Sequence, residues 1–473
     1  MKILILLSFL LSNVGFAQNT STPYFFGLAS APGHAEDELN DIWLDWAHLD
    51  QTRAWANQAV PEKRLEFWTK PEVELDLAQQ TGIEVYRLGI DWGRVMTGPD
   101  QFDEKSLTRY REIFKKVKQR NMKIMLSLFH HSVPKWIQHK GGWTNPETKK
   151  HFVHFSQKII QEFHTDVTYW ITINEGNIFA TLAYTVGMWP PGDKRAATSL
   201  LTFGPFLGDT VLAMDLMAES HNEIYDWAHK TYPSIRMGIA HNMAYYTGKN
   251  FFNKILATFT DALMNWRFPN LIKGRMDFFG FNYYGAEWIR GTAVDIDPEE
   301  EYSEAGRAIY PTGLYKTLKE IGERFPKIPV IITENGISDE TDILRGAYLI
   351  EHLRAISQAK AEGVPVEGYI FWTLSDNMEW ADGYCPKFGL VAVDRKNNLT
   401  RIPRPSFELF KQIASTKTIT KQMQDDAWKK VQDNIGKERP LCRAEDGKTA
   451  LDNPRMRKIV PKDWRFYSSS ESE

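Results

Sequence analysis

The chain has 473 residues, of which 42% are hydrophobic, and its formal net charge is −3 at pH 7. This length suits one large barrel or two to three ordinary domains, and the hydrophobic fraction is sufficient for a substantial core. A nearly balanced charge gives no electrostatic reason to expect a nucleic acid or an anionic surface as a partner.

The first residues have the features of a cleavable signal peptide. Lys2 precedes an apolar run over residues 3–11, and Gly15-Phe16-Ala17 places small residues at a cleavage site. The run is too short to span a bilayer, and no cysteine follows Ala17 to carry a lipid anchor. We expect residues 1–17 to be a signal peptide, with export to the periplasm or the exterior; a retained anchor is the alternative.

Strand-like apolar segments alternate with segments of helical periodicity along most of the chain. The predicted strands are residues 24–29, 85–92, 123–129, 167–173, 237–241, 278–284, 330–333 and 366–372. Helical periodicity is found at residues 106–118, 146–163, 209–230 and 344–362. Because each parallel crossover needs a dozen or more residues, this alternation predicts parallel pairing. We predict an α/β fold, a closed (β/α)8 TIM barrel, with its chemistry at the C-terminal ends of the strands.

Three long connections are expected to shape a substrate cleft on one face of the barrel, at residues 32–71, 184–205 and 285–310. Residues 18–415 are assigned to the barrel. The chain then becomes charged and polar, and residues 416–473 are predicted to be a C-terminal extension packed on the barrel. Its basic stretch, residues 453–466, is expected to be a solvated face rather than a membrane contact.

Cysteine use is sparse. Only Cys385 and Cys442 occur, so the sequence contains no disulfide framework. After export the two thiols can form one bridge, but nothing in the sequence requires it.

Two glutamates stand at the ends of apolar strands. Residues 167–173 lead into Asn174-Glu175, and residues 330–333 lead into Glu334-Asn335-Gly336. A carboxylate at the C-terminal tip of a barrel strand is costly as part of a core but well placed for chemistry. Two facing carboxylates are the groups that cleave a glycosidic bond.

No metal or other cofactor is expected. The neighbouring His130 and His131 could suggest a metal site, but no carboxylate or cysteine joins them at ligand spacing. The predicted chemistry therefore depends on amino-acid side chains alone.

Five segments, in order along the chain, resemble the motifs of glycoside hydrolase family 1. Trp170-Ile-Thr-Ile-Asn-Glu175 is similar to its acid/base motif, and Ile332-Thr-Glu334-Asn-Gly336 to its nucleophile motif. The other three are Phe129-His-His-Ser-Val-Pro134, Asp277-Phe-Phe-Gly-Phe-Asn-Tyr-Tyr284 and Phe371-Trp-Thr-Leu-Ser-Asp-Asn-Met-Glu-Trp-Ala-Asp-Gly-Tyr384. The similarity covers residues 24–415 and implies a retaining β-glycosidase of the β-glucosidase or β-galactosidase type.

The resemblance implies a role for each site residue. Glu334 would be the nucleophile, and Glu175 the acid/base, whose proton affinity the charge on Glu334 would raise. The residues implied to support the nucleophile are Arg87, Tyr284 and Asn282. Those implied to contact the sugar are His34, His130, Asn174, Trp372, Glu379 and Trp380. For Arg87, Trp372 and Asn282 a purely structural role, as an ion-pair, core or turn residue, remains the alternative.

Two positions depart from the family pattern. His34 stands where most members carry Gln, and Gly176 stands where they carry Pro, which is expected to loosen the backbone after Glu175. Residues 27–37 and the late Asp463-Trp-Arg-Phe466 resemble instead a subgroup, the plant galactolipid galactosyltransferases linked to freezing tolerance. These enzymes transfer a β-galactosyl unit between galactolipids.

Three functions follow from these motifs. The first is hydrolysis of a β-glycoside, and the second is transglycosylation on a galactolipid or another glycolipid. The third belongs to another class, an inactive barrel that binds sugar or lipid. The intact glutamate pair argues against the third.

Overall fold

The computed structural model describes residues 19–48, 63–192, 203–291, 293–443 and 450–467. The predicted signal peptide, residues 1–17, lies outside the described residues. Parts of two predicted cleft loops, residues 49–62 and 193–202, lie outside them as well.

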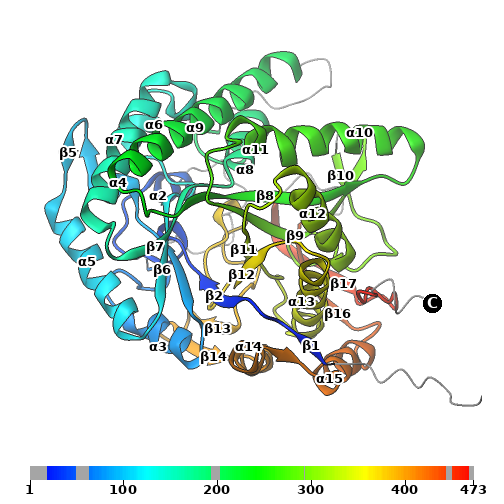
Figure 1. Cartoon of the computed structure of the whole chain (residues 1–473). Coiled ribbons are helices and arrows are strands. Elements are labelled where there is room, and N and C mark those ends of the chain that lie inside the picture. The colour runs from blue at the N-terminus through cyan, green and yellow to red at the C-terminus, as the bar shows by residue number, and fades with distance from the viewer. Residues whose placement is uncertain (1–18, 49–62, 193–202, 292, 444–449, 468–473) are drawn as a thin grey trace, which may run out of the picture.

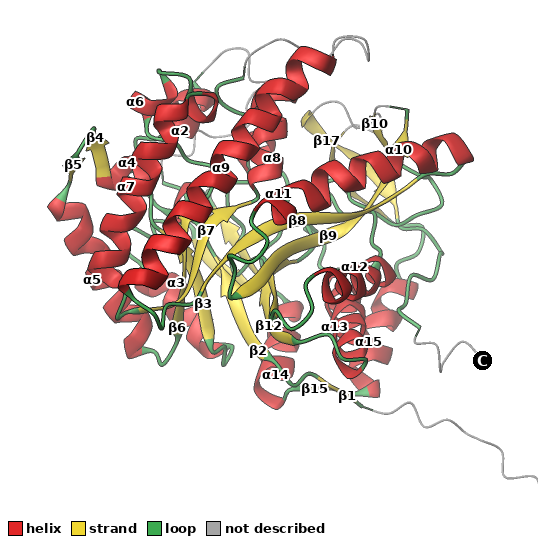
Figure 2. Cartoon of the chain, turned by 45° about the horizontal axis from the view of Figure 1, so that its top comes forward, coloured by secondary structure: helices red, strands yellow, loops and turns green. Residues whose placement is uncertain are grey.

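Eight parallel strands close into a barrel (Figures 1 and 2). They are β2 (Phe25–Ala29), β3 (Val85–Gly89), β6 (Lys123–Phe129), β7 (Val167–Asn174), β8 (Met237–Thr247), β9 (Phe278–Arg290), β11 (Val330–Asn335) and β12 (Val366–Phe371). The order is β9-β11-β12-β2-β3-β6-β7-β8, and β8 pairs back onto β9. The predicted (β/α)8 barrel is confirmed.

Helices surround the barrel on its outer side (Figure 2). They are α1 (Pro32–Ala35), α2 (Ile42–Ala47), α3 (Glu72–Gln80), α4 (Trp92–Val95), α5 (Glu104–Gln119), α6 (Lys135–Gln138), α7 (Pro146–Phe163), α8 (Gly176–Ala180), α9 (Phe203–Thr231), α10 (Phe251–Asp261), α11 (Arg267–Leu271), α12 (Pro311–Arg324), α13 (Arg345–Ala361), α14 (Pro405–Thr416) and α15 (Lys421–Gln432). Short 3-10 turns are η2 (Gly142–Thr144) and η6 (Trp380–Asp382), and π-helical turns are η3 (Thr181–Val186) and η5 (Ala262–Trp266). Local signals set several of these starts; Pro146, for example, opens α7 behind an Asn145 cap.

Smaller strands decorate the barrel. They are β1 (Thr20–Ser21), β4 (Met96–Gly98), β5 (Gln101–Phe102), β10 (Ala293–Asp295), β13 (Val391–Asp394), β14 (Thr400–Pro403), β15 (Thr418–Ile419), β16 (Glu438–Arg443) and β17 (Ala450–Lys458). Most are two-stranded antiparallel pairs, and β10 extends the edge of β9.

Three strands, β3, β8 and β9, differ from the prediction by three or more residues at one end. β3 ends at Gly89 because Asp91 caps α4, accepting a hydrogen bond from the amide of Arg94. β8 and β9 run on past residues 241 and 284, because they continue to pair with each other beyond the barrel, as far as Thr247 and Trp288.

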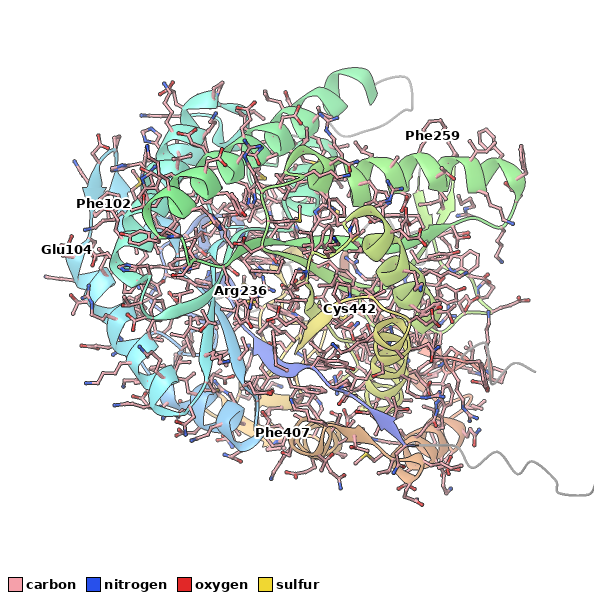
Figure 3. All side chains as sticks on the ribbon, in the orientation of Figure 1. Phe102, Glu104, Arg236, Phe259, Phe407 and Cys442 are labelled. Carbon is pink, nitrogen blue, oxygen red and sulfur yellow. A yellow bond between two sulfur atoms is a disulfide. The ribbon has the colours of Figure 1, made fainter. Side chains whose placement is uncertain are left out.

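The region after residue 416 contacts the barrel through apolar and covalent links. Trp428 of α15 and Trp464 pack with Tyr348 of α13 in one buried cluster. The hairpin β16–β17 is joined to the loop after β12 by a disulfide between Cys385 and Cys442 (Cys442 is labelled in Figure 3), so the two cysteines do pair.

Candidate active site

Both predicted glutamates lie at the C-terminal end of the barrel, one after β7 and one on β11, with β8 and β9 between these two strands. Glu175 follows β7 as the first residue of the turn into α8, with φ 46° and ψ 47°. Its amide donates to the carbonyl of Ala240 at 2.7 Å, which fixes this left-handed conformation. Glu334 is a residue of β11 and is 3% exposed. Glu334 is therefore held by a strand, and Glu175 by a turn of fixed conformation directly after one.

One hydrogen-bond network connects the two carboxyls. The Arg87 guanidinium, fully buried on β3, donates to Glu334 Oε1 at 2.5 Å and to Asn174 Oδ1 at 2.7 Å. Asn282 Nδ2 donates to that same Asn174 oxygen at 3.0 Å and to Glu175 Oε1 at 2.8 Å. Side chains of three strands, β3, β7 and β9, thus meet at one amide oxygen, and Arg87 links this point to Glu334 of β11, so the two carboxyls are held in one polar cluster.

Asn282 departs from its expected role. Its backbone is in register with Glu334, but its side-chain amide reaches Glu175 and Asn174, while its oxygen accepts from Thr333 Oγ1 at 2.7 Å. Tyr284, by contrast, donates its hydroxyl proton to Glu334 Oε2, as the family resemblance implied. Asn282 is therefore a partner of Glu175 rather than a support for Glu334.

The two carboxyls have opposite pKa shifts. Burial raises the pKa of Glu334 to about 7, against the opposing effect of the Arg87 charge and the Tyr284 hydrogen bond. Burial also acts to raise the pKa of Glu175, but hydrogen bonds from His131, Asn242 and Asn282 lower it to about 2. This order is the reverse of the expected one, because Glu175 has more hydrogen-bond donors around it than the motif alone revealed. Between these two values the pair holds a single proton.

The residues predicted to contact the sugar gather into an aromatic wall. The His34 ring centre lies 4.0 Å from that of Trp380, 4.7 Å from Trp372 and 5.5 Å from His130. Trp372 Nε1 donates to Glu379 Oε1 at 3.1 Å, and burial raises the pKa of Glu379 well above its usual range. The wall therefore combines flat apolar faces with one carboxyl whose pKa is raised by burial.

Gly33 allows this packing. A Cβ atom at Gly33 would lie 2.7 Å from the Trp380 ring, which no real contact permits. A side chain here would push Trp380 off His34.

His34 presents an unused hydrogen-bond acceptor. Burial lowers the pKa of His34 to about 3, so the ring is neutral, and Nδ1 faces the carbonyl of Met378. A carbonyl only accepts, so Nδ1 carries the proton and Nε2 is an acceptor. Within the described part of the chain nothing donates to this buried atom.

His130 presents the complementary donor. Asn174 uses its oxygen for two other donors, so its Nδ2 faces His130 Nε2 at 3.2 Å. Burial lowers the pKa of His130 well below its usual range, so the neutral ring carries its proton on Nδ1. No acceptor from the described residues reaches that buried Nδ1 atom. A sugar hydroxyl, which both donates and accepts, suits this pair of histidines.

Gly176 is tightly packed rather than loose. A Cβ at this position would lie 2.9 Å from Met217 Sδ and 3.1 Å from Ile173 Cγ2. The glycine departure therefore lets α9 and β7 close in behind Glu175.

Sequence reasoning missed two partners of Glu175. Asn242 of β8 donates to Glu175 Oε1 at 2.8 Å, and His131 Nε2 lies 3.6 Å from Oε2. Asn242 follows a buried strand segment as Asn174 does, so a polar residue at the end of the fifth strand was the available signal. For His131, next to His130, the sequence suggests only a metal ligand, and no motif marks it as a partner of Glu175. No group of three or more His, Cys, Asp or Glu side chains within the described ranges is arranged to hold a metal.

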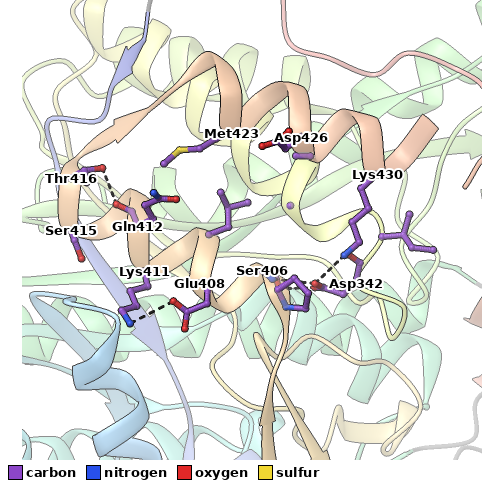
Figure 4. Close-up of a pocket in the computed structure, with 15 residues that line it drawn as sticks. Asp342, Ser406, Glu408, Lys411, Gln412, Ser415, Thr416, Met423, Asp426 and Lys430 are labelled. Atoms are coloured by element: carbon purple, nitrogen blue, oxygen red, sulfur yellow. Dashed lines mark hydrogen bonds and ion pairs between the residues drawn. The ribbon is translucent and has the colours of Figure 1, made fainter. Parts of the chain in front are cut away.

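A separate groove of about 610 Å³ lies between α14 and α15 (Figure 4). Its polar rim includes the ion pair of Lys430 with Asp342 and that of Lys411 with Glu408. None of the predicted site residues lines this groove. The carboxyl pair and the aromatic wall are therefore the better candidate for chemistry.

Known proteins resemble this chain over the barrel that carries the two glutamates. A model described as glycosyl hydrolase family 1 matches residues 36–250 and 267–419. The chloroplastic galactolipid galactosyltransferase SFR2 of Arabidopsis thaliana is 38% identical over 512 residues, covering 94% of this chain and 82% of that protein. The chloroplastic beta-glucosidase-like SFR2 of Oryza sativa subsp. japonica is 42% identical over 540 residues, covering 94% and 83%.

A solved structure agrees in fold. A beta-glycosidase from Pyrococcus horikoshii aligns with a TM-score of 0.77 and 26% identity, covering 87% of this chain and 98% of that one. Similarity in sequence and in fold therefore extends over the whole barrel that carries the glutamate pair.

Proposed function

The chain belongs to glycosyl hydrolase family 1 and is a retaining β-glycosidase, and we propose that Glu334 and Glu175 perform its two displacement steps. The observation that carries this assignment is the network in which Arg87 and Asn282 meet at Asn174 and link both carboxyls. Glu334 contacts a guanidinium and a phenol, whereas Glu175 contacts amide donors. Different surroundings of this kind give two carboxyls different pKa values and therefore different acid–base roles.

In the first step a Glu334 oxygen attacks the anomeric carbon while the bond to the leaving oxygen breaks. Glu175 gives its proton to that oxygen. The reactive form is the singly protonated pair with the proton on Glu175, which is the minor of its two forms because the pKa order favours the proton on Glu334; Arg87 and Tyr284 stabilise the charge on Glu334 in that form.

In the second step the ester to Glu334 removes that carboxyl's negative charge. Glu175, surrounded by donors that favour its ionised form, takes a proton from the incoming hydroxyl. The hydroxyl oxygen attacks the anomeric carbon and the ester bond breaks, which restores the original configuration.

A second proposal concerns the acceptor. We infer that the enzyme transfers β-galactosyl units to a glycolipid, with water as the competing acceptor. The support is the 38% and 42% identity, over 94% of the chain, to two SFR2 proteins, one of them described as a galactolipid galactosyltransferase. Hydrolysis and transfer share the glycosyl-enzyme and differ only in the hydroxyl that resolves it.

Product analysis separates the two outcomes. Purified enzyme is incubated with monogalactosyldiacylglycerol, and the products are resolved as free galactose and as oligogalactosyl lipid. Dominant oligogalactosyl lipid supports transfer, whereas free galactose alone would leave hydrolysis as the only activity. Glu334→Gln serves as the control that forms neither product.

We further propose that the protein is exported after cleavage near Ala17. The Lys2-led apolar run supports this, and so does the disulfide between Cys385 and Cys442, which fits an oxidising compartment. Mass spectrometry of the purified mature protein should find an N-terminus near Gln18. An intact Met1 in the cell-associated protein would contradict cleavage.

A further inference from the structure

Helix α10 turns its large apolar side chains away from the protein. Phe251, Phe252, Ile255 and Phe259 are 81%, 64%, 39% and 70% exposed. At 3.6 residues per turn they occupy one arc of about 100° on the outer face. Figure 3 shows Phe259 on the outer side of the helix. Of the large hydrophobic side chains in the described ranges, the three phenylalanines are the most exposed.

The inner face of α10 is small and polar. Asn253 and Ala257 are buried, and Asn253 Oδ1 accepts from the amide of Gly291 at 3.2 Å. A surface helix normally buries its apolar stripe and exposes its polar one. In α10 this arrangement is reversed, so packing on the barrel does not account for the phenylalanines.

The helix lies on the catalytic side of the barrel. It follows β8, the strand that carries Asn242 and then continues for five residues beyond it to Thr247. The π-helical turn η5 then leads back to the site, where the carbonyl of Met264 accepts from His241 Nε2 and from Asn177 Nδ2, both at 2.9 Å. Figure 1 shows α10 extending outward beside β10. The segments on either side of α10, β8 and η5, therefore both contribute atoms to the surroundings of Glu175.

Most charges beside α10 are paired with one another. Lys249 lies 2.9 Å from Asp297, and Arg290 lies 3.2 Å from Asp295, while α10 itself carries one exposed cation, Lys254. A single lysine beside the apolar face gives little attraction to an anionic surface, so the face fits an uncharged surface better. The helix also falls between the two stretches that match the family model, so the shared machinery of the family does not explain it.

We propose that α10 docks on an electrically neutral lipid bilayer, with its phenylalanine face inserted at the level of the headgroups. Eleven residues give a helix about 16 Å long, too short to cross a bilayer but suited to lying in its surface. No helix among the described residues combines the length and apolarity needed to cross a membrane.

A second copy of the chain is a poorer occupant. One face of a helix about 16 Å long and 10 Å wide covers on the order of 200 Å² per copy, against about 800 Å² per partner in a stable interface. A bilayer has no such area requirement, because each inserted side chain gains its transfer free energy separately.

Docking at this position would present lipid-linked sugars to the rim that carries Glu175 and Glu334. This consequence rests on the proposed glycolipid substrate, whereas the docking itself does not. The two ideas can therefore fail separately.

Vesicle flotation tests the docking. The purified full chain is mixed with phosphatidylcholine vesicles, with and without monogalactosyldiacylglycerol, at low and high salt. We expect binding to both kinds of vesicle, with little loss at high salt. The triple variant Phe251→Ser, Phe252→Ser, Phe259→Ser should bind at least about tenfold more weakly. Its hydrolysis of a soluble aryl β-glycoside should match that of the unmodified protein.

A matched control removes three exposed apolar side chains from other elements. Ile402→Ser, Ile435→Ser, Met456→Ser changes residues that are 52%, 43% and 54% exposed, and it should bind vesicles as the unmodified protein does. A separate Phe259→Trp variant should show blue-shifted emission when vesicles are added, which reports insertion of this face directly.

Three results would overturn the inference. The first is an unmodified protein that stays unbound, and the second is a triple serine variant that binds equally well. The third is a dimer in sedimentation velocity that the triple variant converts to monomer, without vesicle binding. Vesicle binding with no galactosyl transfer would instead contradict only the proposed transferase activity.

Discussion

At the residue scale, Glu334 and Glu175 are distinguished by their neighbours. Glu334 has a buried guanidinium and a phenol, and Glu175 has two amide groups and an imidazole. We expect Glu334→Gly to lower kcat by about 10⁴-fold or more, because the covalent intermediate cannot form. With added azide and an activated aryl glycoside, this variant should yield only a glycosyl azide of inverted configuration, assigned by NMR. A retained azide product would remove Glu334 from the nucleophile role.

Glu175→Ala should discriminate between leaving groups. Without the acid, substrates with poor leaving groups lose protonation assistance, worth about 10²–10⁴-fold, while activated aryl glycosides lose much less in the first step. The measurement is kcat/KM over a series of aryl β-glycosides of graded leaving-group pKa. Equal slowing across the series would argue against Glu175 as the acid.

The pH profile follows from the shared proton. The pair is singly protonated between the pKa of about 2 for Glu175 and that of about 7 for Glu334, so kcat/KM should fall as pH rises through about 7. The Tyr284 hydrogen bond favours ionised Glu334 and lowers its pKa. Tyr284→Phe removes this effect and should move the alkaline limb to higher pH. An alkaline limb that stays in place, or moves down, would contradict the assignment.

His34 is expected to act on the sugar hydroxyls through Nε2. His34→Phe keeps a ring against Trp380 but removes the acceptor, which should lower kcat/KM by roughly tenfold to a hundredfold. His34→Gln restores an acceptor and should recover part of this loss, with a shifted preference between glucosides and galactosides. Equal kcat/KM values for all three proteins on both sugars would show that His34 makes no contact with substrate.

At the element scale, the disulfide holds the loop that carries Glu379 and Trp380. Cys385 follows Trp380 by five residues and is bonded to Cys442 of β16, 57 positions further along the chain. We expect Cys442→Ser to lower the free energy of unfolding by about 2–4 kcal/mol, since a closed loop of this length is released in the unfolded chain. Urea titration measures the change, and a reducing agent should destabilise the unmodified protein but not the variant. Equal stability with and without reductant would contradict this role.

The sequence predicted the barrel strands because their signal is local. Residues 330–333 and 167–173 are short apolar runs with β-branched residues, which are typical of buried strands. Glu334 follows the first run directly, and Glu175 follows the second after Asn174. The extensions of β8 and β9 depend instead on pairing between segments about 40 residues apart, which no local pattern encodes. Where hairpin β16–β17 lies, the sequence predicts only a charged and polar extension, because charged residues such as Arg457 and Lys458 hide the pattern of a strand. Asn242 belongs to none of the five family motifs, so its position directly after the predicted strand 237–241 is the only signal for it in the sequence.

At the scale of the whole molecule, a buried carboxylate joins the barrel to the region after residue 416. Glu351 of α13 is fully buried and accepts hydrogen bonds from Trp428 Nε1 at 2.7 Å and from the amide of Phe466 at 3.0 Å. Its other partners include Gln424 at 2.9 Å and Arg354 at 3.0 Å. Without residues 417–473, this carboxylate would keep only the contacts that α13 itself provides. A buried charge with too few hydrogen-bond donors would then lower the free energy of unfolding of the barrel.

The region after residue 416 also packs against a residue that positions the neighbour of the nucleophile. Tyr348 packs in the cluster with Trp428 and Trp464, and its hydroxyl accepts from Asn335 Nδ2 at 2.9 Å, next to Glu334. A chain ending at residue 416 is therefore expected to be insoluble or inactive. Graded substitutions at one position are more informative than this truncation, because they leave the fold in place.

Trp428 is that position. Trp428→Phe keeps an aromatic ring in the cluster but removes the hydrogen bond to Glu351, which should cost about 1–3 kcal/mol of unfolding free energy. Trp428→Ala adds the loss of packing and should cost about 3–5 kcal/mol. Urea denaturation measures both, with aryl β-glycoside hydrolysis below the transition as the check that the site is intact. If neither variant shifts the midpoint, or if the truncated chain is stable and active, the barrel folds independently of these contacts.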